Sequence, residues 1–274
     1  MRRALVGCLA LSLGATPIGV FLTLRRMSLT GDAMAHAILP GAAIGYLISG
    51  LSLGAMTLGG IAAGLAVAIL SGLVARNTVA REDASLAAFY LISLAIGVLI
   101  VSTRGSNVDL LHVLFGTVLA LDDNAIYLIS GIATFTLLTL AVFYRPLIME
   151  CVDPGFLRSV SPLSPVAHYG FLVLTVLNLV GGFHALGTLM SVGIMILPAA
   201  AARFWARDTT MLLIISSVAA FLSGAVGLLL SYHLSLPSGP AIILTAGLFY
   251  VLSLCLGIYS TPMTRLREKR HLEA

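Results

Sequence analysis

The chain has 274 residues, of which 59% are hydrophobic and only 9% are charged, and its mean hydropathy is +1.07. Soluble domains carry about 25% charged residues, so this composition excludes an ordinary soluble protein, and disorder needs the opposite balance. At about 20 apolar residues per crossing, a chain of this length has no room for a sizeable soluble domain. The sequence therefore predicts an all-α polytopic membrane helix bundle, a single transmembrane domain over residues 1–274.

Stretches without charged residues, divided at turn-forming clusters, predict eight or nine transmembrane helices. The expected spans lie near residues 4–24, 31–49, 53–74, 84–102, 125–143, 166–181, 186–202, 209–231 and 241–259. The longest stretches are divided at residues 49–52, at Gly181 and Gly182, and at residues 234–240. Residues 109–121 are apolar but too short to cross, so we expect them to be re-entrant or interfacial.

The distribution of cations predicts the orientation. With the N-terminus outside and nine crossings, twelve of the fifteen Lys and Arg residues fall on the inner side, against Arg2, Arg3 and Arg104 outside. Because Lys and Arg concentrate in cytoplasmic loops, we expect a multi-pass protein of the cell membrane (inner or plasma membrane) with a cytoplasmic tail over residues 260–274. The pI of about 9.2 then reflects topology and contact with lipid, not nucleic-acid binding.

The longest predicted inner loop, residues 144–165, contains a signal for the start of a helix. Asp153 suits the N-cap position and Pro154 the first helical position. One apolar side of this short helix would hold Phe156, Leu157 and Val160. The segment is either a helix that docks on a cytoplasmic partner or a solvated connector, and the residues leave both open.

Asp32 and His36 form the most informative pair of polar residues. They are four apart, so they share one helix face within reach of a single ion. His36 lies about 15 Å beyond Arg26 at the inner interface, near mid-membrane, where such groups are costly unless they face a cavity or a partner. A carboxylate with an imidazole suits zinc, manganese or ferrous iron. The pair favours a metal path; alternatively, Asp32 caps the helix and His36 bonds to a neighbouring helix.

Pro40 follows His36 by one turn and predicts a bend or break, a feature common in transport sites. Three other histidines fall on the predicted outer face, where they would suit receipt of a metal cation or be ordinary polar surface; these are His112, His184 and His233. No role is assigned to His168 or His271.

Enzyme and nucleotide motifs are missing from the sequence. Lys269 is the only lysine, so no Walker A loop is possible and the chain does not itself grip ATP through one. There is no His-Glu-x-x-His motif and no Cys-x-x-Cys pair. We therefore expect a transporter without a permanently bound cofactor.

Four segments, in order, resemble the membrane permeases of metal-uptake ABC transporters, which import zinc, manganese or iron. The most specific is residues 24–41, where Gly-Asp-Ala is followed by His and Leu-Pro-Gly, with Ala35 in place of the usual Ser. The other similar segments are residues 108–111 with 114–116, residues 197–203 and residues 236–240. The resemblance covers nearly the whole chain.

The resemblance implies a complex of two permeases, expected to be a homodimer, and two ATPases fed by an external metal-binding protein. It implies that Asp32 and His36 line the ion path and that the Asp153 loop supplies the helix seated on the ATPase, with coupling residues Asp153, Pro154, Phe156, Leu157 and Arg158. Leu157 and Ser161 stand where the family tends to have Ala and Gly, which predicts a docking surface specialised for its own ATPase. The outer histidines favour zinc slightly over manganese or iron. The alternatives are a gradient-driven secondary metal carrier and a membrane enzyme.

Overall fold

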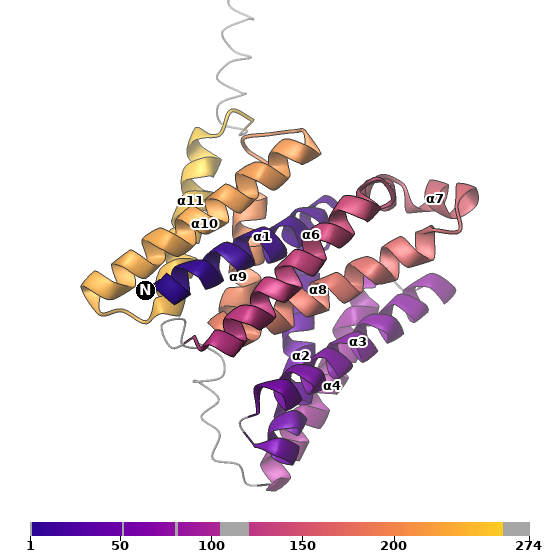
Figure 1. The fold of residues 1–274 in the computed structure, drawn as a ribbon. Helices are drawn as coiled ribbons and strands as arrows, with labels where there is room; N and C mark the ends of the chain where they lie inside the picture. Colours follow the sequence, from indigo (N-terminus) through magenta and orange to yellow (C-terminus); the bar gives the residue numbers. More distant parts are fainter. Residues whose placement is uncertain (1, 51, 80–81, 105–120, 260–274) are drawn as a thin grey trace, which may run out of the picture.

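The computed structural model describes residues 2–50, 52–79, 82–104 and 121–259, and these residues form ten helices (Figure 1). The helices are α1 (Arg2–Leu24), α2 (Ser28–Ser49), α3 (Leu53–Asn77), α4 (Glu82–Arg104), α6 (Asp123–Val152), α7 (Pro154–Val160), α8 (Ser164–Leu186), α9 (Thr188–Ala202), α10 (Thr209–Leu234) and α11 (Ser238–Leu256). The predicted all-helical membrane bundle is confirmed. Residues 109–120 with His112, and the predicted tail with His271, lie outside the described residues.

Seven helices of the described part are long and apolar enough to cross a membrane. The two other long helices are α2 and α9. The first carries Asp32 and His36 among its apolar residues, and the second has only 15 residues. That α2 and α9 also cross the membrane, as a count of eight or nine spans requires, stays a prediction.

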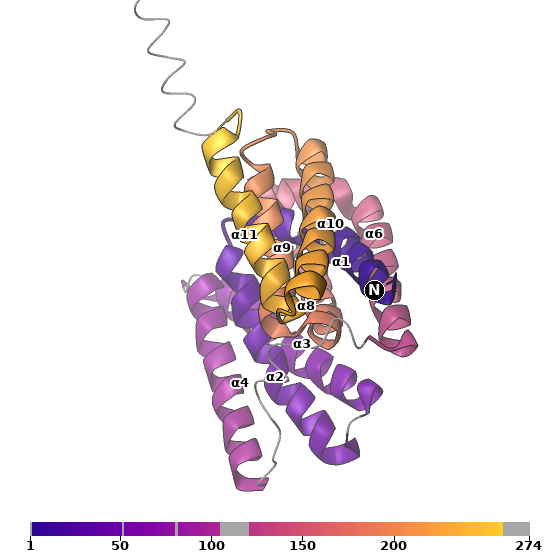
Figure 2. The ribbon, with the colours of Figure 1, turned by 90° about the vertical axis from the view of Figure 1, so that its left-hand side faces the viewer.

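The centre of the bundle is formed by α1 and α8. In the most apolar stretch of each of these two helices, 72% of the residues are buried, against 17% in the corresponding stretch of α4. Phe21 of α1 and Phe171 of α8 are fully buried and meet edge to face with ring centroids 6.4 Å apart. Helices α6, α9 and α10 pack around α1, while α2, α3 and α4 form a second group beside α8 (Figures 1 and 2). The outer helices therefore expose long apolar faces to lipid or to another subunit.

One predicted helix boundary is wrong. The turn expected at Gly181 and Gly182 does not form, because α8 continues through both residues to Leu186. The chain turns at Gly187, whose φ of 80° lies in the left-handed region that favours glycine. Gly182 serves packing instead, since a Cβ there would lie 2.5 Å from the Cβ of Ser191 in α9. His184 consequently lies in a helix and not in an outer turn.

The predicted loop at residues 144–165 is also mostly helical. Helix α6 does not end near residue 143 but bends at Phe143 (φ −97°, ψ 15°) and continues to Val152. The bend has a local cause, because Pro146 cannot donate to the carbonyl of Val142. Helix α7 fills most of the remaining loop and projects at the edge of the bundle (Figure 1).

Helix ends gather on two sides of the bundle. Polar contacts join the residues after α1, the end of α3, the end of α6 and the start of α8 beside α7. At the other side, Arg3 near the start of α1 pairs with Asp123 at the start of α6, with 2.9 Å between Nη2 and Oδ2. This alternation agrees with the predicted order of crossings, while the assignment of the α7 side to the cytoplasm stays a prediction.

Candidate functional site

A tight reversal of the chain places Asp32 inside α2. The backbone amides of Arg26 and Met27 donate to the carbonyls of Thr23 and Leu22, and Arg26 takes a left-handed conformation with φ of 58°. This is the Schellman geometry that ends many helices, and it lets α2 start at Ser28, with Met27 at the N-cap. The alternative in which Asp32 caps α2 is therefore wrong.

Asp32 and His36 lie one turn apart, and the Nε2 atom of His36 is 3.8 Å from the Oδ1 atom of Asp32. Their side chains are 59% and 39% exposed in the single chain. His36 is eight residues beyond Ser28, about 12 Å along the helix axis. A carboxylate and an imidazole are thus available together, well inside the length of α2, for a ligand that approaches from outside this chain.

Helix α4 packs along the part of α2 that carries His36. The ring of Tyr90 stacks beside that of His36, with centroids 6.3 Å apart and planes inclined by 28°. One turn further along α4, the Oγ atom of Ser93 donates to the carbonyl of Ala37 at 3.3 Å. Gly97 then faces Pro40 so closely that a Cβ on it would lie 2.5 Å from the Cβ of the proline. Pro40 lies inside α2 and does not break it.

Two of the predicted outer histidines lie in other helices, and His112 lies outside the described residues. His233 is exposed in the last turn of α10, where its ring meets that of Tyr232 edge to face, and His184 lies near the end of α8. Among the described residues there is no group of three or more His, Cys, Asp or Glu side chains that could hold a metal ion. The described part of one chain therefore offers two ligands at α2.

Helix α7 has the predicted start. The Oδ1 atom of Asp153 accepts a hydrogen bond from the amide of Phe156 at 2.9 Å, and Pro154 occupies the first turn. The predicted apolar side is divided, however. Leu157 is 4% exposed and packs into the permease, whereas Phe156 and Val160 are 52% and 65% exposed. Leu157 therefore anchors α7, and the exposed side, which also carries Arg158, is open to a partner.

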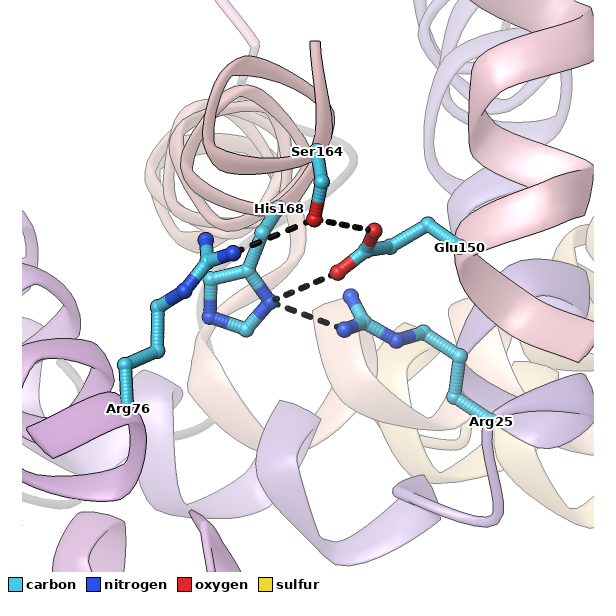
Figure 3. A network of polar contacts seen from close by, with 5 residues as sticks. All are labelled: Arg25, Arg76, Glu150, Ser164 and His168. Atoms are coloured by element: carbon cyan, nitrogen blue, oxygen red, sulfur yellow. Dashed lines mark hydrogen bonds and ion pairs between the residues drawn. The ribbon is translucent and has the colours of Figure 1, made fainter. Parts of the chain in front are cut away.

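A buried polar cluster lies at the base of α7, and sequence reasoning missed it. Its members come from four parts of the chain and are Arg25, Arg76, Glu150, Ser164 and His168 (Figure 3). The Oγ atom of Ser164 donates to Glu150 Oε2 at 2.9 Å and accepts from Arg76 Nη2 at 3.1 Å. Arg25 Nη2 lies 2.9 Å from His168 Nδ1. Only the placement of Glu150 and His168 on either side of the Asp153 segment could have pointed to this cluster.

Long apolar helices, with a polar pair on α2 and a short capped helix at one side, define a multi-pass membrane protein. The chain belongs to the ABC 3 transport family, which matches residues 1–257. It is similar to the manganese import system permease protein ScaB of Streptococcus parasanguinis, with 32% identity over 253 residues, 92% of this chain and 89% of ScaB.

Two further proteins extend the comparison. The chelated iron transport system membrane protein YfeD of Yersinia pestis is 27% identical over 254 residues, 93% of this chain and 84% of YfeD. Among solved structures, a chain of PsaBC from Streptococcus pneumoniae in complex with Fab superposes with a TM-score of 0.82 and 29% identity over 98% of this chain and 94% of that chain.

The chain is therefore the permease subunit of an ABC metal importer, in which a separate ATPase hydrolyses ATP. Family membership decides against the gradient-driven carrier and the membrane enzyme. The relatives named above are manganese and iron proteins, and they do not support the preference for zinc.

Proposed function

We propose that two copies of this chain form a path for Mn²⁺ or Fe²⁺, which an external binding protein delivers and a cytoplasmic ATPase drives inward. The observation that carries the proposal is the Asp32 and His36 pair, two metal-ligating side chains one turn apart and 59% and 39% exposed on an otherwise apolar helix. Such groups within a membrane need a polar partner or a water-filled cavity.

A second copy is the partner that fits this pair best. The described residues bring no third ligand to Asp32 and His36, so a single chain would bind a divalent cation weakly. Two copies that face each other along α2 would supply two carboxylates and two imidazoles. Mixed oxygen and nitrogen ligands with positions left for water suit Mn²⁺ and Fe²⁺, and a site shared by two chains opens when the chains move apart.

The exposed side of α7 supports docking of the ATPase. Phe156 and Val160 leave apolar surface open beside the exposed Arg158, while Leu157 and the cap at Asp153 hold the helix on the permease. An apolar contact with a neighbouring charge is a common form of interface core and rim. Replacing Phe156 or Arg158 with alanine should reduce co-purification of the ATPase; undiminished association would place the contact elsewhere.

Metal uptake by cells tests the path directly. Cells that lack other importers and express the whole transporter should accumulate Mn²⁺ or Fe²⁺, and Asp32→Ala or His36→Ala should reduce uptake to background because half of each chain's ligand pair is lost. Asp123→Ala is the matched control, since this exposed carboxylate lies at the start of α6 and pairs with the exposed Arg3. Uptake at the wild-type level in both α2 variants would refute the path, and a clear preference for zinc would refute the metal assignment.

A further inference from the structure

The polar cluster at the base of α7 joins the residues before this helix to the residues after it. Glu150 lies three residues before the cap Asp153, and Ser164 lies four residues after the last residue of α7. The hydrogen bond of 2.9 Å between Ser164 Oγ and Glu150 Oε2 therefore ties the incoming helix α6 to the outgoing helix α8. Because Leu157 is also buried, α7 cannot swing freely on its two connections and has to move with the cluster.

Burial makes the members of the cluster depend on one another. Glu150, Ser164 and His168 are 3%, 0% and 4% exposed, and buried charges are stable only when they are paired and hydrogen-bonded. A guanidinium only donates, so the nitrogen of His168 that faces Arg25, Nδ1, accepts. The guanidinium groups of Arg76 and Arg25 lie on opposite sides of the imidazole of His168, and the carboxylate of Glu150 lies on the side of Arg25 (Figure 3). Displacement of one member would leave another without its partner.

Both arginines lead from the cluster to α2. Arg25 lies three residues before the start of α2, and its guanidinium sits over the ring of Phe171 at 5.2 Å as well as against His168. Arg76 belongs to the last turn of α3. Helix α3 packs closely on α2, because a Cβ on Gly41 would collide with the carbonyl of Gly59. A shift of α6 and α8 at the base of α7 is thus passed to the start of α2 and to the end of α3, the helix that packs on α2.

We infer that the cluster of Arg25, Arg76, Glu150, Ser164 and His168 is a mechanical link that transmits displacement of α7 to the helix carrying Asp32 and His36. This rests on the proposed function, in which α7 receives the ATPase and α2 carries the metal. Apolar side chains can slide past one another. The directed hydrogen bonds of the cluster instead fix the position of α6 and α8 relative to α2 and α3, so that the four helices move together. These five residues position the moving helices and do not touch the metal.

Two pairs of variants distinguish a link from a merely structural cluster. Ser164→Ala removes the hydroxyl between Arg76 and Glu150; its control, Ser216→Ala, alters an equally buried serine bonded to the carbonyl of Leu213 within α10. His168→Leu removes the acceptor for Arg25, whereas His168→Asn keeps an acceptor oxygen near the position of Nδ1. The complete complex is reconstituted in liposomes, and ATP hydrolysis is measured without and with the Mn²⁺-loaded binding protein, together with Mn²⁺ uptake.

We expect Ser164→Ala and His168→Leu to keep the basal hydrolysis rate but to transport about twofold to thirtyfold less Mn²⁺ per ATP, the range for mutations along a coupling route. His168→Asn and Ser216→Ala should stay coupled. Wild-type coupling in Ser164→Ala and His168→Leu would overturn the inference, as would failure of Ser164→Ala and His168→Asn to assemble with the ATPase, which would show a structural role. A wild-type complex that neither transports Mn²⁺ nor responds to it would instead refute the proposed function.

Discussion

The described residues include two pairs of a carboxylate and an imidazole at nearly the same separation. Asp32 and His36 are 3.8 Å apart, and Glu150 and His168 are 3.9 Å apart. The side chains of the first pair are 59% and 39% exposed, and the side chains of the second are 2% and 5% exposed. Separation alone therefore does not identify a metal site.

The surroundings of the two pairs differ in what they leave free. Ser164 donates to Glu150 Oε2 and Arg25 donates to His168 Nδ1, so other side chains of the protein already occupy these two atoms of the buried pair. Among the described residues, the pair on α2 has its own contact of 3.8 Å and the stacked ring of Tyr90. We therefore propose that the same two residue types serve transport where they stay open to a ligand and serve cohesion where protein donors occupy them.

The largest loss in the free energy of unfolding should follow removal of the buried carboxylate of Glu150. Glu150→Ala would remove the buried carboxylate that accepts from Ser164 and lies in one cluster with two arginines, and loss of a buried counter-charge costs about 3 kcal/mol or more. Asp32→Ala should change the free energy of unfolding by only about 0.5 kcal/mol, as exposed substitutions do. Unfolding of the purified permease in mixed micelles with increasing SDS measures both. Equal losses of stability in the two variants would contradict the contrast between the pairs.

Stabilisation by added metal should depend on the exposed pair, Asp32 and His36, and not on the buried pair. A ligand that binds only the native state at about 100 times its Kd stabilises it by about 2.7 kcal/mol. We expect Mn²⁺ to raise the stability of the assembled wild-type complex and of His168→Asn, but not of Asp32→Ala. The measurement is thermal unfolding with and without Mn²⁺. Loss of the Mn²⁺ effect in His168→Asn, with retention in Asp32→Ala, would assign metal binding to the buried pair.

The sequence was sufficient for the open pair and for the start of α7. Spacing alone places Asp32 and His36 on one helix face, and the order Asp153, Pro154 signals a cap that the structure shows, with 2.9 Å from Asp153 Oδ1 to the amide of Phe156. Both features depend on residues within four positions of each other, where backbone geometry determines the outcome.

Features that depend on distant partners could not be predicted. Arg25 and His168 are 143 positions apart, and no local pattern links them. By their sequence, Gly181 and Gly182 predict a turn, but a glycine pair in a membrane helix serves close packing equally well. Only the approach of Ser191 to Gly182 decides between the two. The continuation of α6 past Pro146 also depends on distant contacts, since packing at the base of α7 overrides the local tendency of proline to end a helix.

A change at the contact between α4 and α2 should have an intermediate effect on stability and should disturb the exposed pair, Asp32 and His36. Gly97→Ala would place a Cβ 2.5 Å from Pro40, and overpacking of this kind costs about 1–3 kcal/mol. By moving α4 away from α2, it should also weaken the stack of Tyr90 on His36 and reduce Mn²⁺ uptake. Gly131→Ala is the matched control, because a Cβ on Gly131 in α6 meets no atom within 4 Å. SDS unfolding and uptake together test this; unchanged stability and uptake in Gly97→Ala would show that the contact does not position His36.

The smallest effect on stability should come from the ion pair between Arg3 and Asp123, although its distance is shorter than that of either carboxylate and imidazole pair. Arg3 Nη2 and Asp123 Oδ2 are only 2.9 Å apart, yet their side chains are 62% and 61% exposed. Water and salt screen such a pair, so a double-mutant cycle with Arg3→Ala and Asp123→Ala should give an interaction energy of about 0–1 kcal/mol that falls further at high salt. SDS unfolding of the four proteins at low and high NaCl measures it. An interaction as large as the loss in Glu150→Ala would mean that distance outweighs burial, whereas the two carboxylate and imidazole pairs indicate that burial and available donors decide what a charged contact contributes.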